Sequence, residues 1–153
     1  MRNQQGFSLI ELLIAVVLIA IIAALAIPSL LQSRRAANEA SAIQSLRTIA
    51  SAENAYFSAL GSSAKYGTLD QLHAAGLVDS SLTGAGFTKS GYAFTHSVST
   101  PSDRYCADAL PGVGEGVRVF GTDRNSSILQ DLTDPTPCEN GVLDTAGGTA
   151  LRS

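Results

Sequence analysis

Tryptophan is absent from this chain, and charge is nearly absent from its first part. Of the 153 residues, 10 are basic and 13 are acidic, yet residues 1–33 contain only Arg2 and Glu11. A soluble globular protein spreads its charges along the sequence, so this segregation excludes a simple soluble domain. The length allows one modest domain and is too short for two sizeable ones.

The chain also lacks an excess of basic residues and any recognisable catalytic pattern. Its net charge is −3 and its pI is near 5.2, so the footprint of a nucleic-acid-binding protein is missing and no nucleic-acid partner is expected. His73 and His96 are the only histidines, and neither stands in a metal-ligand cluster of the sequence. We therefore predict a protein that is not an enzyme, has no catalytic residues and carries no cofactor.

A long apolar run follows the polar start of the chain. Phe7 to Ile27 is 21 residues, which as a helix would extend about 31 Å and cross a bilayer. Glu11 is the one charge within it, at an insertion cost of about 2.5–3.5 kcal/mol that calls for a partner or a function. A cleaved secretory signal peptide and a plain signal anchor, with Glu11 near the interface, are the alternative interpretations.

The residues around Glu11 identify a known type of segment. The run Gly6-Phe7-Ser8-Leu9-Ile10-Glu11-Leu12, after a short polar and basic leader, resembles the processing site of type IV prepilins and type II secretion pseudopilins. The resemblance implies that prepilin peptidase cuts between Gly6 and Phe7 and that the new Phe7 amine is methylated. It also implies a homo-oligomeric helical filament, in which Glu11 of one subunit pairs with the Phe7 amine of a neighbour and sets the assembly register.

Pro28 stands late in the apolar run. Proline removes one helical hydrogen bond and clashes with the preceding turn, so a kink or a melted stretch is expected before it. The resemblance implies helix unwinding in assembled filaments, and a simple kink at the membrane boundary is the alternative.

Beyond Pro28 the pattern becomes amphipathic. Ile43, Leu46 and Ile49 share one helical sector with Tyr56, Phe57 and Leu60, which predicts a single helix from about Ser8 to Leu60. Glu53 falls inside this apolar sector. We interpret it as an edge residue that extends to solvent, with a contact to another subunit as the alternative.

The remaining residues predict a small head with an antiparallel sheet. Thr68 and Gln71 have capping-box spacing, which indicates a short helix at 69–75. Alternation predicts a strand at 91–99, further strands at 104–109 and 116–120, and a hairpin from 116–120 to 127–130. The segment after Cys138 is polar and is expected to be loosely held.

Two further features of the head concern its cysteines and a set of oxygen ligands. Cys106 and Cys138 suit a disulfide in an oxidising compartment, with two unpaired thiols as the alternative. The resemblance implies a C-terminal disulfide loop, here residues 106–138. Asp123, Asn125 and Asp134 loosely resemble a calcium-binding loop, although a hairpin turn also explains the first two.

These observations predict an α+β, pilin-like fold. We expect a leader at 1–6, a transmembrane and filament-core helix at 7–33, its amphipathic half at 34–60, and a globular head at 61–153. The expected function is that of a pilin in a type IV pilus-like filament, with roles in adhesion or motility. The alternatives are a type II secretion pseudopilin similar to general secretion pathway protein G and, from another class, a non-polymerising periplasmic binding module anchored in the membrane.

The resemblance also implies a location and further partners. The precursor would span the bacterial inner membrane once, with a cytoplasmic N-terminus and a periplasmic head. The assembled protein would lie in a surface pilus or a periplasmic pseudopilus. Its partners would be prepilin peptidase, an inner-membrane assembly platform and other copies of the chain.

Overall fold

The computed structural model describes residues 7–59, 65–84, 86–130, 138–144 and 148–151. The chain divides into two compact units, residues 1–34 and residues 35–153. The elements in chain order are α1 (Leu9–Ala59), α2 (Leu69–Ala74), the short 3-10 helix η1 (Ser80–Leu82), β1 (Gly86–Lys89), β2 (Tyr92–Val98), β3 (Tyr105–Pro111), β4 (Phe120–Asp123), β5 (Ile128–Gln130), β6 (Cys138–Glu139), β7 (Val142–Leu143) and β8 (Thr149–Ala150).

Helix α1 confirms the single long helix expected from the sequence. It runs without interruption over 51 residues, from Leu9 to Ala59, while Leu60 lies outside the described residues. Alanine recurs through its second half and supports the helical conformation there. The first unit consists of the apolar part of α1, and the second unit begins with the amphipathic part.

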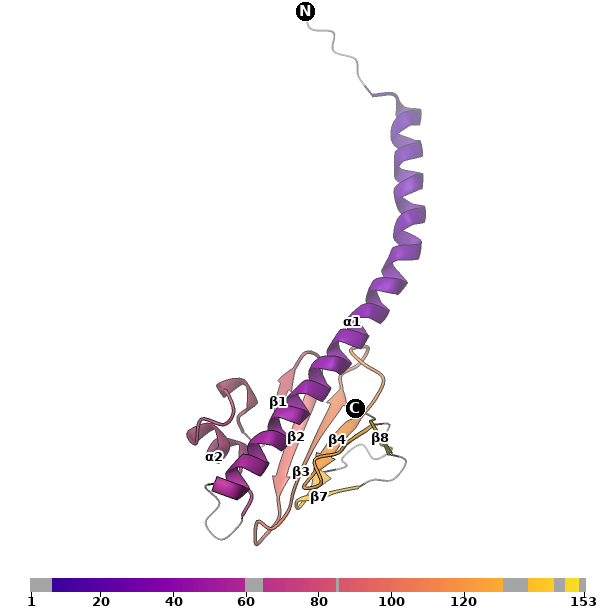
Figure 1. Cartoon of the computed structure of the whole chain (residues 1–153). Helices are drawn as coiled ribbons and strands as arrows, with labels where there is room; N and C mark the ends of the chain where they lie inside the picture. Colours follow the sequence, from indigo (N-terminus) through magenta and orange to yellow (C-terminus); the bar gives the residue numbers. More distant parts are fainter. Residues whose placement is uncertain (1–6, 60–64, 85, 131–137, 145–147, 152–153) are drawn as a thin grey trace, which may run out of the picture. The chain divides into compact units, whose positions relative to one another are not determined.

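In the second unit, an antiparallel sheet packs on the amphipathic part of α1 (Figure 1). The sheet has six strands in the order β1-β2-β3-β4-β5-β8, and β6 and β7 form a separate two-stranded sheet. Every pairing is antiparallel, and the central pair aligns Phe94 of β2 with Ala109 of β3, which in turn aligns with Phe120 of β4. These observations confirm the predicted α+β class.

The hydrophobic core lies between α1 and the sheet. Leu46 and Ile49 of α1 are fully buried, as are Tyr92 and Phe120 of the sheet. Burying side chains of this size contributes about 1.5–3 kcal/mol each, so this interface accounts for much of the stability of the second unit. Of the predicted apolar sector, Ile43 and Tyr56 are only partly buried and pack at the border of this core.

The short helix α2 forms where the capping pattern predicts it. Thr68 Oγ1 accepts a hydrogen bond from the Gln71 amide at 3.4 Å, and Gln71 Oε1 accepts one from the Thr68 amide at 2.8 Å. Gly76 follows the helix with a φ of +71°, the left-handed conformation that glycine adopts at low cost. Leu69 and Leu72 then face the core.

The predicted strand at 116–120 is wrong for most of its length, because β4 begins only at Phe120. The backbone before it binds other partners. The Val117 amide donates to Glu39 Oε1 at 3.1 Å, and the Arg118 carbonyl accepts from Tyr92 Oη at 3.0 Å. We call residues 112–119 the β3–β4 loop. The predicted hairpin exists with shifted bounds, as β4 pairs with β5.

The strand at 91–99 is confirmed as β2, and the strand at 104–109 corresponds to β3. In contrast, the expectation of a loosely held segment after Cys138 is wrong for residues 138–143 and 149–150, while 145–147 and 152–153 lie outside the described residues. Cys138–Glu139 pairs with Val142–Leu143 across a turn at Asn140-Gly141, and β8 adds to the edge of the main sheet beside β5. A Cβ atom at Gly141 would lie 2.6 Å from the Arg104 carbonyl oxygen, so this turn requires glycine where it touches the β2–β3 connection.

Tyr92 provides a pH-dependent prediction. Burial raises the pKa of its hydroxyl from 10.0 to about 12, so the hydroxyl stays protonated in the folded chain at pH values where the unfolded chain loses the proton. Its contribution to the free energy of unfolding is complete below pH 10 and is lost as the pH rises from about 10 to about 12. The free-energy difference between the native chain and Tyr92→Phe, measured by urea unfolding in detergent, should be constant from pH 7 to 9 and change above pH 10. Equal alkaline losses in both proteins would contradict this expectation.

Candidate functional site

The first turn of α1 holds the residues that the sequence marks for processing and assembly. Phe7, just before the helix, is 85% exposed, and Glu11 is exposed in the first turn. Gly6 lies outside the described residues. Within the described part of the chain, no hydrogen bond or ion pair reaches the Glu11 carboxylate, so its only internal stabilisation is the positive end of the helix dipole.

The side chains that follow are apolar and unburied. The helix is long and apolar enough, by length and composition, to cross a membrane, and none of its most apolar 18-residue window is buried within the chain. Contiguous exposed apolar surface of this extent indicates contact with lipid or with other protein. The large exposed apolar residues of this segment are Phe7, Leu9, Ile10, Leu12, Leu13, Ile14, Val16, Val17, Leu18, Ile19, Ile21, Ile22, Leu25, Ile27, Leu30 and Leu31.

Pro28 lies inside α1 without ending it. The helix is continuous on both sides of this residue, so the single chain does not have the melted stretch that the sequence offered as one outcome. The unwinding that the resemblance implies for an assembled filament stays a prediction. Its physical basis is the hydrogen bond that proline cannot donate.

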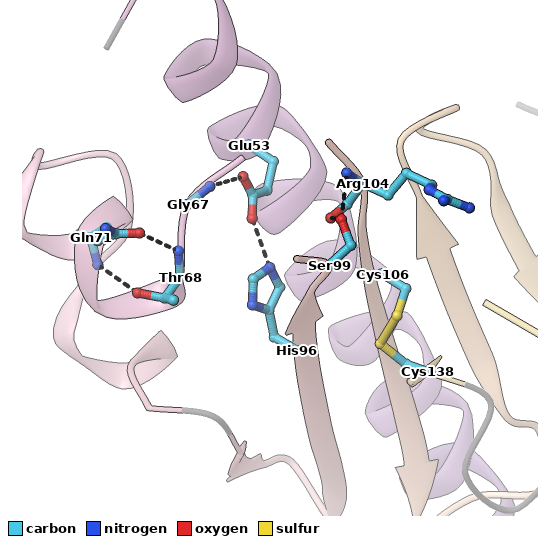
Figure 2. A network of polar contacts seen from close by, with 9 residues as sticks. All are labelled: Glu53, Gly67, Thr68, Gln71, His96, Ser99, Arg104, Cys106 and Cys138. Carbon is cyan, nitrogen blue, oxygen red and sulfur yellow. Dashed lines mark hydrogen bonds and ion pairs between the residues drawn. A yellow bond between two sulfur atoms is a disulfide. The ribbon is translucent and has the colours of Figure 1, made fainter. Parts of the chain in front are cut away.

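In the head, Glu53 joins three segments (Figure 2). Its side chain is fully buried, and its two carboxylate oxygens have separate partners: His96 Nε2 at 2.7 Å and the Gly67 amide at 3.1 Å. The expectation that Glu53 is an edge residue extending to solvent is therefore wrong. A buried carboxylate is tolerated only when it is paired in this way.

Aromatic rings pack beside this buried pair. The ring centroids of Tyr66 and Tyr105 lie 4.9 Å apart, those of Tyr66 and Phe57 4.7 Å apart, and those of His96 and Tyr105 6.1 Å apart. Burial, reinforced by the nearby Glu53 charge, raises the pKa of the Tyr105 hydroxyl above its usual value of 10.0. These rings pack next to the buried Glu53–His96 pair.

The two cysteines form a disulfide on the opposite side of β3 from the helix. Cys106 and Cys138 are bonded with a Cα–Cα distance of 5.5 Å, and both are buried in a small cluster with Leu143. Val119 and Leu129 pack at its border. Because side chains alternate along a strand, Cys106 faces away from the α1 core that Ala107 lines. The disulfide thus fixes β6 and β7 to the sheet.

Removing this disulfide should cost measurable stability. The bond joins residues that are 32 positions apart, and closing such a loop contributes about 3.7 kcal/mol in the chain-entropy treatment. We expect the double variant Cys106→Ala/Cys138→Ala to lose roughly this amount in urea unfolding of the detergent-solubilised chain. Adding reductant should reproduce the loss in the native chain and leave the variant unchanged. A reductant effect on the variant would trace the loss to something other than this bond.

Two of the three oxygen ligands proposed from the sequence, Asp123 and Asn125, form hydrogen bonds with each other in the turn after β4. One Asp123 carboxylate oxygen accepts the Asn125 amide at 2.9 Å, and the other accepts the Asn125 side-chain amide at 2.9 Å. Asp134 lies outside the described residues, so a calcium site formed by all three residues stays a prediction. Among the residues that the structure describes, there is no group of three or more His, Cys, Asp or Glu side chains able to hold a metal ion.

Comparison with known proteins bears on the N-terminal segment. Residues 1–27 match the family model of the prokaryotic N-terminal methylation motif. The chain carries a prepilin-type N-terminal motif. This finding confirms the resemblance drawn from Gly6 to Leu12, and it places Phe7 and Glu11 within the matched range.

A curated relative extends the comparison. The type IV wide pilus major component PilA4 of Thermus thermophilus is 59% identical over 39 residues, which cover 26% of this chain and 30% of the relative. The chain thus aligns with less than a third of that protein. No solved structure matches the chain. The prepilin-type motif is therefore established on the N-terminal segment, and the apolar helix and the disulfide fit it.

The prepilin-type motif was visible in the sequence, whereas the Glu53–His96 pair was not. Glu53 stood out as a charge in an apolar sector, and His96 as a polar member of a strand face that also holds Tyr92 and Phe94. A charged residue in the apolar sector of a helix and a polar residue on the apolar face of a strand, on two elements expected to pack together, are the signal that would have paired them. The bond to Glu53 makes His96 a hydrogen-bonded side chain of the core.

Proposed function

We propose that this protein is a structural subunit of a type IV pilus-like filament. One observation carries the proposal: a prepilin-type motif begins a helix whose apolar N-terminal segment is unburied, and the one acidic residue of that segment, Glu11, has no partner within the described chain. A second copy of the same helix supplies both an apolar surface and an amine, so self-association satisfies both requirements at once.

Processing prepares the helix for this association. Cleavage between Gly6 and Phe7 removes Arg2 with the leader and leaves an α-amine at Phe7, next to the apolar run. Methylation keeps the positive charge of this amine and adds apolar surface. Before assembly, the helix holds the subunit in the inner membrane as a single-pass protein with a periplasmic head.

Assembly then moves the helices from lipid into a bundle. There, the Glu11 carboxylate of one subunit lies against the Phe7 amine of the next. A buried charge without its partner is strongly destabilising, so a subunit that docks out of register is rejected. The pair thereby contributes specificity more than strength. An assembly platform in the inner membrane is the partner that adds subunits.

A type II secretion pseudopilin is the second candidate, since its helix and processing site follow the same pattern. Two observations favour a pilin. The relative that matches this chain is named as the major component of a type IV wide pilus, and the head contains the Cys106–Cys138 disulfide. A pilin reaches the cell surface, whereas a pseudopilin forms a short periplasmic filament.

Mass spectrometry of filaments sheared from intact cells tests this function. We expect the mature chain to begin at an N-methylated Phe7 and to be abundant in the sheared fraction. A mature chain confined to the periplasmic and membrane fractions would indicate the pseudopilin. An uncleaved chain found only in the membrane would overturn both and leave the anchored binding module.

A further inference from the structure

The β3–β4 loop carries an exposed apolar side chain at its tip. Val113 is fully solvent-exposed, and Val117 in the same loop is 73% exposed. Glycines at 112, 114 and 116 surround Val113, so no neighbouring side chain shields it. A lone exposed valine is ordinary, but a valine at the tip of a glycine-rich loop projects from the surface. We call Val113 and the glycines on either side of it the knob.

This projection is held firmly by the amphipathic part of α1. Arg35 Nε donates to the Gly114 carbonyl at 3.0 Å. Asn38 Nδ2 donates both to the Glu115 carbonyl and to Glu115 Oε2, each at 2.9 Å. At the base of the loop, the Gly112 amide donates to the Gly91 carbonyl at 2.8 Å. The knob is therefore presented in one conformation, which lowers the entropic cost of binding.

A groove lies on another part of the same unit. It has a volume of about 440 Å³ and is lined by residues of α1 between Gln44 and Ala55, together with Leu77. Its lining includes the small side chains of Ser51 and Ala52. Arg47 lines it too and forms no ion pair with any residue that the structure describes.

The knob and the groove are complementary in position. At 100° per residue, the α1 residues that hold the loop (35, 38 and 39) and those that line the groove (44–55) point about 160° apart. Their midpoints differ by about 12.5 residues, or roughly 19 Å along the helix. When a patch on one copy binds a different patch on the next copy, and the two patches lie on opposite sides of the molecule and at different heights, repeating the contact does not form a closed ring. It generates an open helical array of copies.

We propose that the β3–β4 loop of one subunit inserts Val113 into the groove on α1 of a neighbouring subunit. The occupant is thus a second copy of this chain, displaced by roughly 19 Å toward the C-terminal end of α1. The inference rests on the proposed filament and adds the head-to-head contact to it. Val113 fills the space above Ser51 and Ala52, and Leu77 covers it from the side.

Polar groups at the rim match as well. The Gly112 and Gly114 carbonyls already accept hydrogen bonds within the subunit, which leaves the Val113 carbonyl oxygen at the tip as an acceptor. The groove offers the Arg47 guanidinium and the Gln44 amide as donors. The Glu115 carboxylate, whose Oε2 already accepts from Asn38 of its own subunit, would in this contact give Arg47 an opposite charge. Arg47 thereby gains in the filament the partner that the single subunit lacks.

Disulfide trapping between separate chains tests the contact. Cells that express one chain with Val113→Cys and a second with Ser51→Cys should yield sheared filaments containing a cross-linked heterodimer under mild oxidation. Because each chain carries one of the two new cysteines, this product can form only between subunits. The matched control pairs Val142→Cys with Ser51→Cys, since Val142 is also exposed (49%) but lies on β7. Abundant filaments without the Val113–Ser51 product would overturn the proposal and leave the filament function intact.

A substitution series gives a second measure. Val113→Asp should lower the yield of sheared filaments by about tenfold, because it places a carboxylate in the contact, while Val142→Asp should leave the yield near that of the native chain. Equal yields for both variants would overturn the contact. Absence of filaments from the native chain would instead overturn the proposed function, together with the inference that rests on it.

Discussion

Replacing Glu11 with valine is expected to give a chain that is inserted and cut after Gly6 but does not assemble. Insertion should proceed because the substitution removes a charge that costs about 2.5–3.5 kcal/mol in the bilayer. Assembly should fail because the Phe7 amine of each docking subunit is then buried without a carboxylate. We expect loss of sheared filaments, with mature protein accumulating in the membrane fraction, as measured by immunoblotting and mass spectrometry.

The neighbouring position provides a control for this result. Leu12→Val changes an exposed apolar side chain in the same turn and keeps Glu11, so it should process and assemble normally. Glu11→Asp retains the charge on a shorter side chain and should restore part of the assembly. Filaments of the valine variant at native abundance would show that Glu11 does not set the register.

The second large effect is expected at Glu53. Glu53→Ala removes the partner of His96 and the acceptor of the Gly67 amide, both inside the core. Breaking a buried pair by removing one member costs about 3–5 kcal/mol. We expect a loss of this size in urea unfolding of the detergent-solubilised chain. Glu139→Ala, which removes an exposed carboxylate from β6, should change stability by no more than about 0.5 kcal/mol.

A double-mutant cycle separates the pair from its surroundings. The single variants Glu53→Leu and His96→Leu should each destabilise the chain, because the first leaves His96 and the Gly67 amide unpaired and the second leaves the carboxylate buried with only the Gly67 amide. Combining Glu53→Leu with His96→Leu should recover much of the loss, since no buried polar group of the pair then remains. Strictly additive losses would mean that the two side chains do not stabilise each other.

The features that the sequence predicted well depend on local patterns. The length of α1 follows from the apolar run and the alanine-rich continuation, and α2 follows from the Thr68–Gln71 capping box. The strand β2 follows from the alternation of Tyr92 and Phe94 with polar residues. The prepilin-type motif is likewise contained in a few consecutive residues. Each of these features is determined by neighbours in the sequence.

The features that the sequence missed depend on distant partners. Glu53 and His96 are 43 positions apart, so no local pattern reveals that these two polar side chains form a buried pair. The segment 116–119 alternates like a strand, but Glu39 and Tyr92 form hydrogen bonds with its backbone. Strand pairing therefore begins only at Phe120. In the C-terminal segment, β8 consists of two residues whose strand conformation comes from pairing with β5, not from their own preference.

The packing of the head also has a consequence for how the protein is made. The α1 face that carries Leu46 and Ile49 leaves the ribosome first, while its native cover, including Phe120 and Ile128, follows much later. During that interval this face is open to unwanted contacts. In the membrane-anchored precursor that we propose, the apolar segment of α1 would hold the nascent chain at the bilayer during this interval. The segment proposed for assembly would thus first act as a tether during folding.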